Sequence, residues 1–517
     1  MPPAPTPVAD LLRLSASRAP DAVAVTGDGR AATYGELAER SDRVADALIA
    51  AGLEPGDRVG YVDRNATEYF ELLFGAAKAG AVLVPLNFRL APDEMRWILA
   101  DAAVSLVVVG PEHAEVPVEE GVPVIVVGPA YEEWLAGARP RDPKRDAAGD
   151  ELIVLMYSSG TTGRPKGVNV TASGLASGVA LFGSCFDLGG RAGEAGGAVS
   201  MVPIPYYHIA GAGWALITIA EGGTLVQCRE PTPASMLDQL IRHRVTHTAM
   251  VPAVIQVMAE LPAARDADFS ALRQIVYGAS PITESLLARA VALFGAEFFQ
   301  SYGLTETIGV TTLLGPDQHL PDNPVKGRLR SAGRAVPGME VAILDLETDR
   351  PADPGVVGEV IVRGPCVTTG YWRNPAETAA AFLPGGWLRT GDAGSMDGDG
   401  YLYLHDRIKD MIVSGGENVY PAEVESALAG HPAVLETAVI GVPSERWGET
   451  PLAVVVPRPG QETTEEELLA WTRERLAHYK CPTAVSFVDA LPRNPSGKVL
   501  KRELRRPWWE GNDRRIG

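Results

Sequence analysis

The chain has 517 residues, of which 46% are hydrophobic and 21% charged, an ordinary composition for a globular protein but too long for one compact core. The formal net charge of −19 argues against a protein that coats nucleic acid, because a phosphate backbone requires a basic surface. The 55 glycines and 41 prolines are scattered rather than periodic, which excludes a collagen-like chain.

The cysteines and the N-terminal residues indicate the compartment. Cys185, Cys228, Cys366 and Cys481 lie far apart and form no CxxC pair, which argues against a zinc site or a disulfide scaffold. The first residues, MPPAPTPVADLLRLSASRAP, lack the basic and apolar regions of a signal peptide. No uncharged apolar stretch is long enough to span a bilayer. The sequence therefore predicts a cytoplasmic protein without a transmembrane segment and without a nucleic-acid partner.

The N-terminal part alternates strand-like and helix-like segments, in the order RVGYVDR, EYFELLFGAAKAG, AVLVPLN, DEMRWILADA and SLVVVG. The same alternation returns in GTLVQC, SMLDQLIRHR, THTAMV, AVIQVMAEL and LRQIVYG. Strands that alternate with helices are typical of parallel sheets with crossover helices. We therefore predict an α/β fold with stacked mixed or parallel sheets in a large N-terminal domain.

The pattern changes twice towards the C-terminus. Near Val336 it becomes a β-rich subdomain of short segments (EVAILD, GEVIVRG, GYLYLHDR) that turn residues separate. Residues 410–517 then combine helical and strand-like segments, which predicts a small α+β domain. The boundary is placed near Asp406–Lys409, so the predicted domains are residues 1–405 and 410–517.

The segment YSSGTTGRPKGVNV (Tyr157–Val170) follows the apolar run Leu152–Met156. It does not match a Walker A loop, which requires G-x-x-x-x-G-K-[ST]. Its glycines nevertheless allow close approach of a phosphate to the backbone, and Lys166 supplies a positive charge. Hydroxyl donors come from Ser158, Ser159, Thr161 and Thr162. The segment therefore predicts a polyphosphate-binding loop, with an ordinary surface loop as the alternative.

Three further segments contain groups that a nucleotide site needs. SYGLTET offers Tyr302 to stack on adenine, Thr305 to donate to the α-phosphate and Glu306 to bind magnesium. RTGD places Asp392 after a glycine turn, where a carboxylate can bind the ribose hydroxyls. PRNPSGKVLKREL places Lys498 on a Pro/Ser/Gly loop. Each segment alone is a weak signal, because turns and loop lysines are common.

Together and in this order, these motifs resemble the adenylate-forming superfamily of acyl-CoA synthetases, amino-acid adenylation domains and luciferases. The resemblance runs from TYGELAERSDRVADAL to SGKVLKREL and includes DRIKDMIVSGGENVYPAEVE. It implies that a carboxylate attacks the α-phosphorus of ATP to give an acyl-adenylate and pyrophosphate, and that a thiol then displaces AMP. It also implies Mg²⁺ and CoA, and a mobile C-terminal domain that turns about a hinge at residues 406–409.

The resemblance assigns roles residue by residue. Lys498, Thr305, Glu306 and His208 would be catalytic, Lys498 by bridging the acyl carboxylate and the α-phosphate and His208 as a gate near that carboxylate. Glu306 and Thr161 would bind the metal. The ATP-binding residues would be Ser158, Ser159, Gly160, Thr161, Thr162, Lys166, Gly278, Ala279, Ser280, Tyr302, Asp392 and Arg407. Lys409 would be the hinge, and Ser414, Gly415, Gly416 and Glu417 would line the pantetheine tunnel.

The acid is less defined than the reaction. By analogy its pocket would include Tyr207, Gly278, Gly303, Gly309 and Val310, with Trp214 nearby, and the three glycines suggest a roomy channel for a fatty or aryl acid. YYHIAGAGW has no aspartate to bind an α-ammonium, which disfavours an amino acid. Val413 replaces a lysine that many aryl-acid ligases carry, so an aryl-type mechanism is less certain.

Two alternatives to a CoA ligase remain. The chain could be a stand-alone adenylating enzyme that passes the acid to a carrier protein, an amine or nitrite, or a non-catalytic binding module. Histidines offer little support for a metal centre, since His243 and His247 are four residues apart with no third ligand nearby. Many family members self-associate, so a homodimer is compatible with the resemblance.

Overall fold

The computed structural model describes residues 5–145, 147–158, 165–186, 188, 197–278, 282, 284–319, 328–415, 417–493 and 499–510. The chain separates into two compact units. The first unit joins residues 1–341 with residues 362–388, and the second joins residues 342–361 with residues 389–517. The domain boundary and the hinge at residues 406–409 stay predictions.

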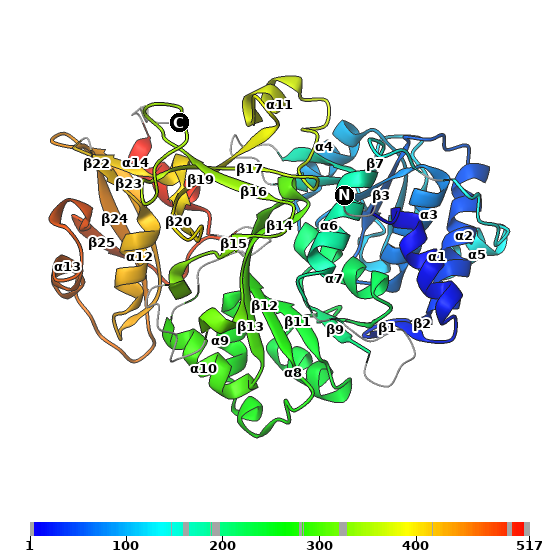
Figure 1. Ribbon diagram of the computed structural model, residues 1–517, viewed down its shortest axis with the longest axis horizontal. Coiled ribbons are helices and arrows are strands. Elements are labelled where there is room, and N and C mark those ends of the chain that lie inside the picture. Colours follow the sequence, from blue (N-terminus) through cyan, green and yellow to red (C-terminus); the bar gives the residue numbers. More distant parts are fainter. Residues whose placement is uncertain are drawn as a thin grey trace. The chain divides into compact units, whose positions relative to one another are not determined.

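The largest sheet has nine strands and belongs to the first unit. Neighbours from β13 to β1 are parallel, whereas β2, β14 and β15 pair antiparallel at the two edges. Figure 1 shows β11, β12 and β13 side by side. In sheet order the strands are β15 (Arg334–Ala335), β14 (Gly309–Leu314), β13 (Glu297–Leu304), β12 (Gln274–Gly278), β11 (His247–Met250), β9 (Val199–Val202), β10 (Thr224–Gln227), β1 (Val23–Gly27) and β2 (Ala32–Thr33).

A second sheet of the first unit has six strands. Its strands are parallel except for the antiparallel pair β7–β8. This pair flanks the predicted phosphate loop, so that loop joins two neighbouring strands. In sheet order the strands are β6 (Val124–Val126), β5 (Val104–Val109), β3 (Arg58–Val62), β4 (Val82–Pro85), β7 (Leu152–Ser158) and β8 (Lys166–Thr171).

Helices supply the crossovers that parallel strands require. Local signals fix their ends: α2 begins with a capping box in which Thr33 and Glu36 bind each other's backbone N–H, and α3 ends at Gly80 with φ +81°. The helices of this unit are α1 (Val8–Arg18), α2 (Tyr34–Ala50), α3 (Thr67–Ala79), α4 (Pro92–Ala102), α5 (Pro129–Ala136), α6 (Ala172–Gly183), α7 (Ile209–Ala220), α8 (Pro233–Arg242), α9 (Pro252–Glu260), α10 (Glu284–Phe294) and α11 (Pro375–Ala381).

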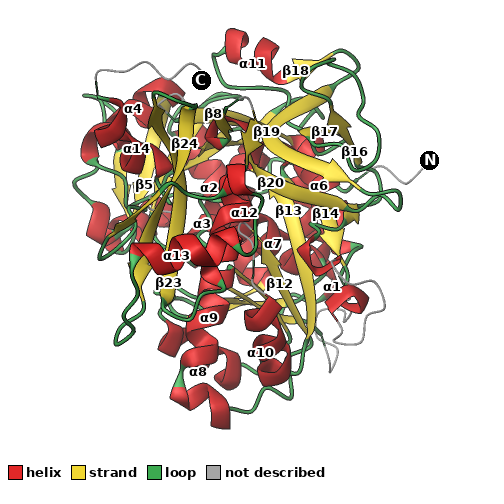
Figure 2. Cartoon of the chain, turned by 90° about the vertical axis from the view of Figure 1, so that its left-hand side faces the viewer, coloured by secondary structure: helices red, strands yellow, loops and turns green. Residues whose placement is uncertain are grey.

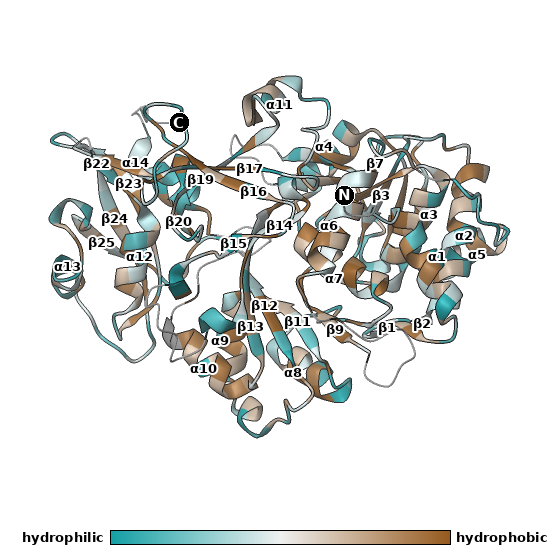
Figure 3. Cartoon of the chain, in the orientation of Figure 1, coloured by the Kyte–Doolittle hydropathy of each residue, from teal (hydrophilic) through white to brown (hydrophobic). Residues whose placement is uncertain are grey.

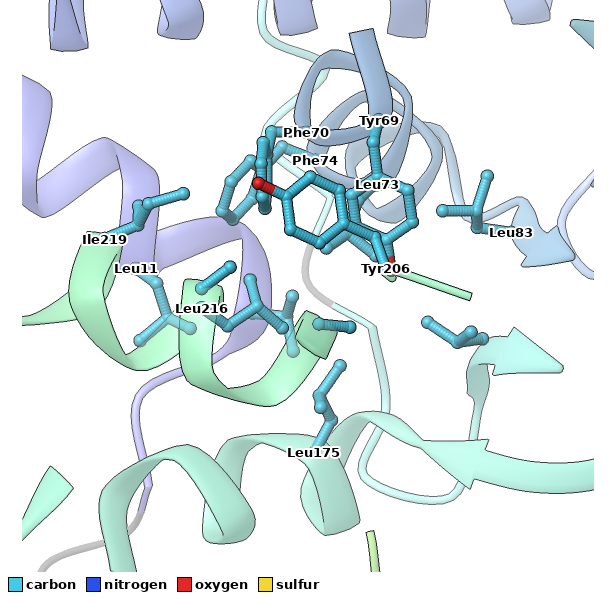
Figure 4. Close-up of a cluster of buried hydrophobic side chains, with 14 of the residues drawn as sticks. Leu11, Tyr69, Phe70, Leu73, Phe74, Leu83, Leu175, Tyr206, Leu216 and Ile219 are labelled. Carbon is cyan, nitrogen blue, oxygen red and sulfur yellow. The ribbon is translucent and has the colours of Figure 1, made fainter. Parts of the chain in front are cut away.

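The main core of the first unit surrounds α3. Every residue of this helix is buried, including Glu68, Glu71 and Lys78, whose charges are balanced by ion pairs with Arg30, Arg40 and Asp42. Figure 4 shows Tyr206 beside Tyr69 and Phe70, and the Phe70 and Tyr206 ring centroids are 5.0 Å apart in an edge-to-face arrangement. Helices α6 and α7 are also largely hydrophobic (Figure 3). The core therefore supports α7 and the strand pair β7–β8, which lie next to predicted site residues.

A separate core cluster lies under α8, α9 and α10, which Figure 2 shows grouped at one end of the nine-stranded sheet. Its buried members include Met236 on α8, Ile255 on α9, Phe294 on α10 and Phe298 on β13. This cluster holds β13 from one side, and β13 carries Tyr302.

A β-rich region follows the large sheets along the chain. Its five-stranded sheet has the order β16-β17-β19-β18, and β20 pairs with β19. The strands are β16 (Glu340–Leu344), β17 (Gly358–Arg363), β18 (Phe382–Leu383), β19 (Trp387–Met396) and β20 (Leu402–Arg407).

The second unit also contains a small α+β structure. Its core packs Ile412, Val424, Val439 and Leu468 together. The sheet has the order β22-β21-β24-β23, with β25 on β24. Its elements are β21 (Ile412–Ser414), β22 (Glu417–Val419), α12 (Pro421–Ala429), β23 (Val434–Ser444), β24 (Gly448–Pro457), α13 (Glu465–Arg473), β25 (Ala484–Phe487) and α14 (Lys501–Trp509). The predicted fold class, with sheets, a β-rich region and a C-terminal α+β part, is confirmed.

Candidate active site

The carboxyl end of β13 carries residues that the sequence assigns to nucleotide and metal. Gly278 at the end of β12 lies opposite Ser301 of β13, and the 3₁₀ turn η3 (Thr305–Thr307) directly follows β13. The carboxyl ends of parallel strands are the usual place for ligands in α/β sheets. The structure brings the following predicted residues together here: Gly278, Tyr302, Gly303, Thr305, Glu306, Gly309 and Val310.

The glycines at this end are required by the backbone. A Cβ on Gly303 would lie 1.9 Å from the Gly309 carbonyl oxygen, and a Cβ on Gly278 would lie 2.4 Å from the Ser301 carbonyl oxygen. Gly309 has φ +134°, a conformation that residues with side chains rarely adopt. The inference of a roomy acyl channel from these glycines is therefore not supported.

Glu306 lies in η3 and is held by a segment from much later in the chain. The Tyr371 hydroxyl donates to Glu306 Oε1 at 3.1 Å. The Thr368 backbone N–H donates to the Glu306 carbonyl oxygen at 2.8 Å. The side chain and the backbone of the metal-ligand candidate are thus both fixed from residues 368–371.

Lys166 is the first residue of β8 and lies opposite Ser158, the last residue of β7. Its ammonium forms an ion pair with Glu377 of α11. The same ammonium lies 5.3 Å from the centroid of the Tyr371 ring, within cation–π range. Tyr371 therefore contacts both Lys166 and Glu306, which are 140 positions apart in the sequence.

Some predicted site residues lie outside the part of the chain that the structure describes, and their roles stay predictions. They are Ser159, Gly160, Thr161, Thr162, Ala279, Ser280, Gly416 and Lys498.

Tyr207 and His208 precede α7 and lie against each other, with ring centroids 4.6 Å apart. The Tyr207 hydroxyl is buried and has no hydrogen-bond partner among the described residues. Trp214 lies within α7, is 3% exposed and donates from Nε1 to Ser200 Oγ at 2.6 Å. Trp214 is therefore a core residue whose polar atom is already satisfied, whereas Tyr207 offers a polar group to a ligand.

Asp392 and Arg407 come together in the second unit. They lie opposite each other on β19 and β20, and Arg407 Nε is 2.7 Å from Asp392 Oδ1. Asp392 is 8% exposed, so its carboxylate needs such a partner. The structure therefore supports a joint placement of the two residues that the sequence assigns to ribose.

The RTGD residues do not form the expected turn but lie within β19, and Glu359 of β17, which sequence analysis did not identify, holds them there. Glu359 Oε2 accepts from Arg389 at 2.6 Å, and Oε1 accepts from the Gly391 N–H at 3.1 Å. Glu359 is 5% exposed. A buried carboxylate thus fixes both a side chain and a backbone N–H of the RTGD segment.

Lys409 lies in the 3₁₀ turn η6 (Ile408–Asp410), and burial lowers the pKa of its ammonium below the ordinary lysine value. The predicted tunnel residues Ser414 and Glu417 lie opposite each other at the turn between β21 and β22. Gly415 in that turn has φ +62°, and a Cβ there would lie 2.7 Å from the Trp447 ring. Glycine is therefore required at this position.

Within the described residues, no group of three or more histidine, cysteine, aspartate or glutamate side chains is placed to bind a metal ion. His247 is buried in β11 with Nδ1 2.7 Å from Thr246 Oγ1, and His243 caps α8. Mg²⁺ in phosphate-transfer sites typically takes one or two carboxylates together with water and substrate phosphates. Glu306, whose carboxylate is oriented by a neutral hydroxyl, fits that requirement.

The residues that sequence analysis missed share one property. Tyr371, Glu377 and Glu359 act on predicted site residues through long-range contacts, and each lies at least 30 positions from the residue that it contacts. For Tyr371 and Glu377 the signal is GYWRNPAET, in which Asn374 caps α11 by accepting from the Glu377 N–H, whereas Glu359 lies outside this segment. This cap indicates a helix start, but not its charged partner.

Comparison with known proteins agrees with this geometry. The family model described as AMP-binding enzyme matches residues 12–372, and the model described as AMP-binding enzyme C-terminal domain matches residues 423–498. The chain belongs to this adenylate-forming family. It is therefore an AMP-forming acid–thiol ligase, and ATP, Mg²⁺ and CoA are the reactants and ion of its class.

Relatives of this adenylate-forming enzyme match along almost the whole chain. A feruloyl-CoA synthase of an Amycolatopsis species is 42% identical over 494 residues, which cover 95% of this chain and 97% of the relative. A fatty acid–[acyl-carrier-protein] ligase of Streptomyces coeruleorubidus is 40% identical over 508 residues, with 97% and 96% covered. The ATP-bound structure of MatB from Rhodopseudomonas palustris superposes with a TM-score of 0.87 at 31% identity. The superposition covers 98% of this chain and 100% of MatB.

The helices among the described residues do not meet the requirements of a membrane span. None of them is both long enough and apolar enough to cross a bilayer.

Proposed function

We propose that this enzyme activates a fatty or aryl carboxylic acid and transfers it to CoA. The observation that carries the proposal is the full-length similarity to acid–CoA ligases, combined with the contacts that Tyr371 makes to Lys166 and Glu306. A cation for phosphate and a carboxylate for a hard metal ion are the charges that a reaction on Mg-ATP requires.

In the first half-reaction an acid carboxylate oxygen bonds to the α-phosphorus, and the bond from that phosphorus to the pyrophosphate oxygen breaks. In the second, the CoA sulfur bonds to the acyl carbon, AMP leaves, and the thiol proton is released. Two anions must approach each other in the first step, so cationic residues are needed to offset the charge that develops at phosphorus. Mg²⁺, when bound with ATP, would add to that compensation.

The proposed roles follow the resemblance. Lys498 bridges the acid and the α-phosphate, Lys166 binds the outer phosphates, and Glu306 binds Mg²⁺. Asp392 with Arg407 binds ribose, as their 2.7 Å ion pair supports. His208 and Tyr207 face the acid, and the buried, unsatisfied Tyr207 hydroxyl within the described residues favours a polar ligand group there.

The remaining proposed roles concern the second half-reaction and the setting of the enzyme. Lys409 is the hinge, and Ser414, Gly415, Gly416 and Glu417 line the pantetheine tunnel. The proposal includes a C-terminal domain that moves about residues 406–409. A cytoplasmic location, a homodimer and the absence of a nucleic-acid partner belong to the same proposal.

A second candidate is a ligase whose acceptor is an acyl-carrier protein. The specific observation in its favour is the 40% identical relative that is a fatty acid–[acyl-carrier-protein] ligase. Both acceptors present the same phosphopantetheine thiol, so the same glycine turn at Gly415 serves either. The two candidates differ in what surrounds the thiol.

The test is to incubate the enzyme with Mg-ATP and a panel of fatty, cinnamic and benzoic acids, with CoA, with a phosphopantetheinylated carrier protein, or with neither. Pyrophosphate and AMP are measured, and acyl products are identified by mass. One acid that gives pyrophosphate alone and a thioester with CoA supports the proposal. Adenylation with transfer only to the carrier protein supports the second candidate, and no pyrophosphate with any acid contradicts both.

A further inference from the structure

Residues 368–374 connect three elements of the first unit, and the proposed roles leave this connection unexplained. The Trp372 N–H donates to the Gly167 carbonyl oxygen on β8 at 2.7 Å. The Thr368 N–H donates to the Glu306 carbonyl oxygen on η3 at 2.8 Å. The Tyr371 N–H donates to Thr378 Oγ1 on α11 at 2.9 Å. This segment, called here the strut, therefore joins the predicted phosphate loop, the predicted metal ligand and α11.

Tyr371 sits at the centre of the strut, where it contacts two groups of opposite charge. Its hydroxyl donates to Glu306 Oε1 at 3.1 Å, and its ring lies 5.3 Å from the Lys166 ammonium. Glu377, on α11, forms an ion pair with the same ammonium. Lys166 is 15% exposed in its side chain and Glu377 is 37% exposed, so this ion pair borders solvent.

These contacts suit a metal ligand and a phosphate ligand. A hydroxyl is a neutral donor, so it orients the Glu306 carboxylate without cancelling the negative charge that a metal ion needs. An aromatic face attracts the Lys166 ammonium without occupying any of its three N–H donors. Tyr371 therefore contacts both groups without neutralising either charge, although Glu377 already accepts one hydrogen bond from the Lys166 ammonium.

We propose that Tyr371 is a positioning residue that orients Glu306 for the metal ion bound with ATP, and that it does so through its hydroxyl. The proposal rests on the proposed function, in which Glu306 binds Mg²⁺. Groups that hydrogen-bond to metal ligands typically change metal affinity by about 10–100-fold when they are removed. A role in packing alone would weaken ATP binding equally with and without the metal.

The test compares ATP binding by calorimetry in excess Mg²⁺ and in EDTA, with no acid present. The ratio of the two dissociation constants measures how much the metal contributes to binding, without any catalytic readout. Tyr371→Phe removes the hydroxyl and keeps the ring near Lys166. We expect it to reduce this ratio about tenfold while the dissociation constant in EDTA changes less than about twofold.

Two further variants make the outcome specific. Tyr131→Phe is the matched control, because Tyr131 donates to Glu71 Oε2 at 2.9 Å and this variant removes a similar tyrosine–glutamate hydrogen bond elsewhere in the same unit. It should leave the Mg²⁺ ratio unchanged. Glu306→Gln removes the metal-binding charge itself. The dissociation constants for ATP in EDTA and in Mg²⁺ should then become nearly equal. In the double variant, Tyr371→Phe should add little to Glu306→Gln, because both act through one carboxylate.

The results separate the two proposals. If Glu306→Gln abolishes the Mg²⁺ ratio and Tyr371→Phe leaves it intact, the positioning role of Tyr371 is wrong and the metal role of Glu306 stands. If Tyr371→Phe weakens ATP binding equally in Mg²⁺ and EDTA, the tyrosine acts through packing and the inference is again wrong. If Glu306→Gln itself retains the ratio, the proposed metal ligand is wrong and the inference fails with it.

Discussion

The Lys501 ammonium lies 2.9 Å from a carboxylate oxygen of Glu425 in the second unit. A second carboxylate, that of Asp406, lies 3.4 Å from the same ammonium. Burial alone would lower the pKa of Lys501, but the attraction of Glu425 and Asp406 raises it above the ordinary lysine value. One cation at the start of α14 thus balances two carboxylates, of which Asp406 belongs to the predicted hinge.

Lys501→Met should therefore destabilise the second unit by about 3 kcal/mol, because removing one partner of a buried ion pair leaves an uncompensated charge. The measurement is urea unfolding followed by fluorescence at pH 7.5. Arg502→Met, at an exposed neighbouring position, is the control and should change stability by less than about 0.5 kcal/mol. Adding Glu425→Gln to Lys501→Met should restore part of the loss. Equal stability of Lys501→Met and the wild type would contradict the expected role.

Glu359 should control ATP affinity through the RTGD segment of β19. Glu359→Gln removes the charge that holds Arg389 and weakens the bond to the Gly391 N–H, and a hydrogen bond to a charged group contributes about 1.5–3 kcal/mol. If Asp392 binds ribose, the KM for ATP in an acid-dependent pyrophosphate exchange assay should rise about tenfold. Glu340→Gln, which removes a carboxylate from an exposed pair with Arg363, is the matched control. A similar rise of the KM for ATP in both variants would show that Glu359 has no specific role in ATP binding.

Lys498 should be essential for adenylation and dispensable for folding. Lys498→Ala should lower the rate of acid-dependent pyrophosphate formation by a factor of about 10² or more, because a cation that offsets charge in the transition state is lost. The unfolding transition should not change. Arg502→Ala removes a nearby exposed positive charge and serves as the control for net charge. Retention of full adenylation by Lys498→Ala would overturn the assignment.

Gly303 should tolerate no side chain. The Cβ of Gly303→Ala would lie 1.9 Å from the Gly309 carbonyl oxygen, so β13 and β14 must move apart, and overpacking of this kind costs about 1–3 kcal/mol. Both the unfolding midpoint and pyrophosphate formation should fall. Gly213→Ala is a suitable control, because a Cβ at this position on α7 has no atom within 4 Å and alanine favours a helix. A stable and active Gly303→Ala enzyme would contradict the close approach of the two strands.

Much of the fold was predictable because its elements follow local rules. The apolar run SLVVVG forms the strand β5, as its composition predicts. The amphipathic run DEMRWILADA forms the helix α4, as its periodicity predicts. The edge pairing of β14 with β13 was not predictable in this way, because it depends on Gly303 and Gly309 meeting across a turn. Periodicity indicates what a segment becomes, but not which neighbour it meets.

The candidate site divides along the same line. Lys166, Glu306 and Asp392 stood out because the sequence around each offers several ligand groups within a few residues. Tyr371 and Glu359 did not stand out, because each contacts a site residue that lies 30 or more positions away in the sequence. The glycines assigned to the acyl pocket show another limit, because the backbone itself requires them and their number therefore does not indicate a roomy channel.

His319 should make the first unit sensitive to acid. Burial lowers the pKa of this histidine to about 4, and its imidazole Nδ1 and Nε2 lie 2.8 Å from the Gly315 carbonyl oxygen and 3.0 Å from the Tyr277 hydroxyl. The unfolded chain binds a proton at this residue below about pH 6.5, whereas the folded protein does so only below about pH 4. Stability from the neutral form is therefore present above pH 6.5 and is lost as the pH falls towards 4.

The expected loss between pH 7.5 and pH 5 is about 2 kcal/mol from this residue alone. Urea unfolding of the wild type and of His319→Gln at both pH values measures it, because the variant keeps a polar side chain but no group that titrates there. The wild type should lose about 2 kcal/mol more than the variant over this interval. Equal losses would mean that the buried histidine does not remain neutral in the folded protein at pH 5.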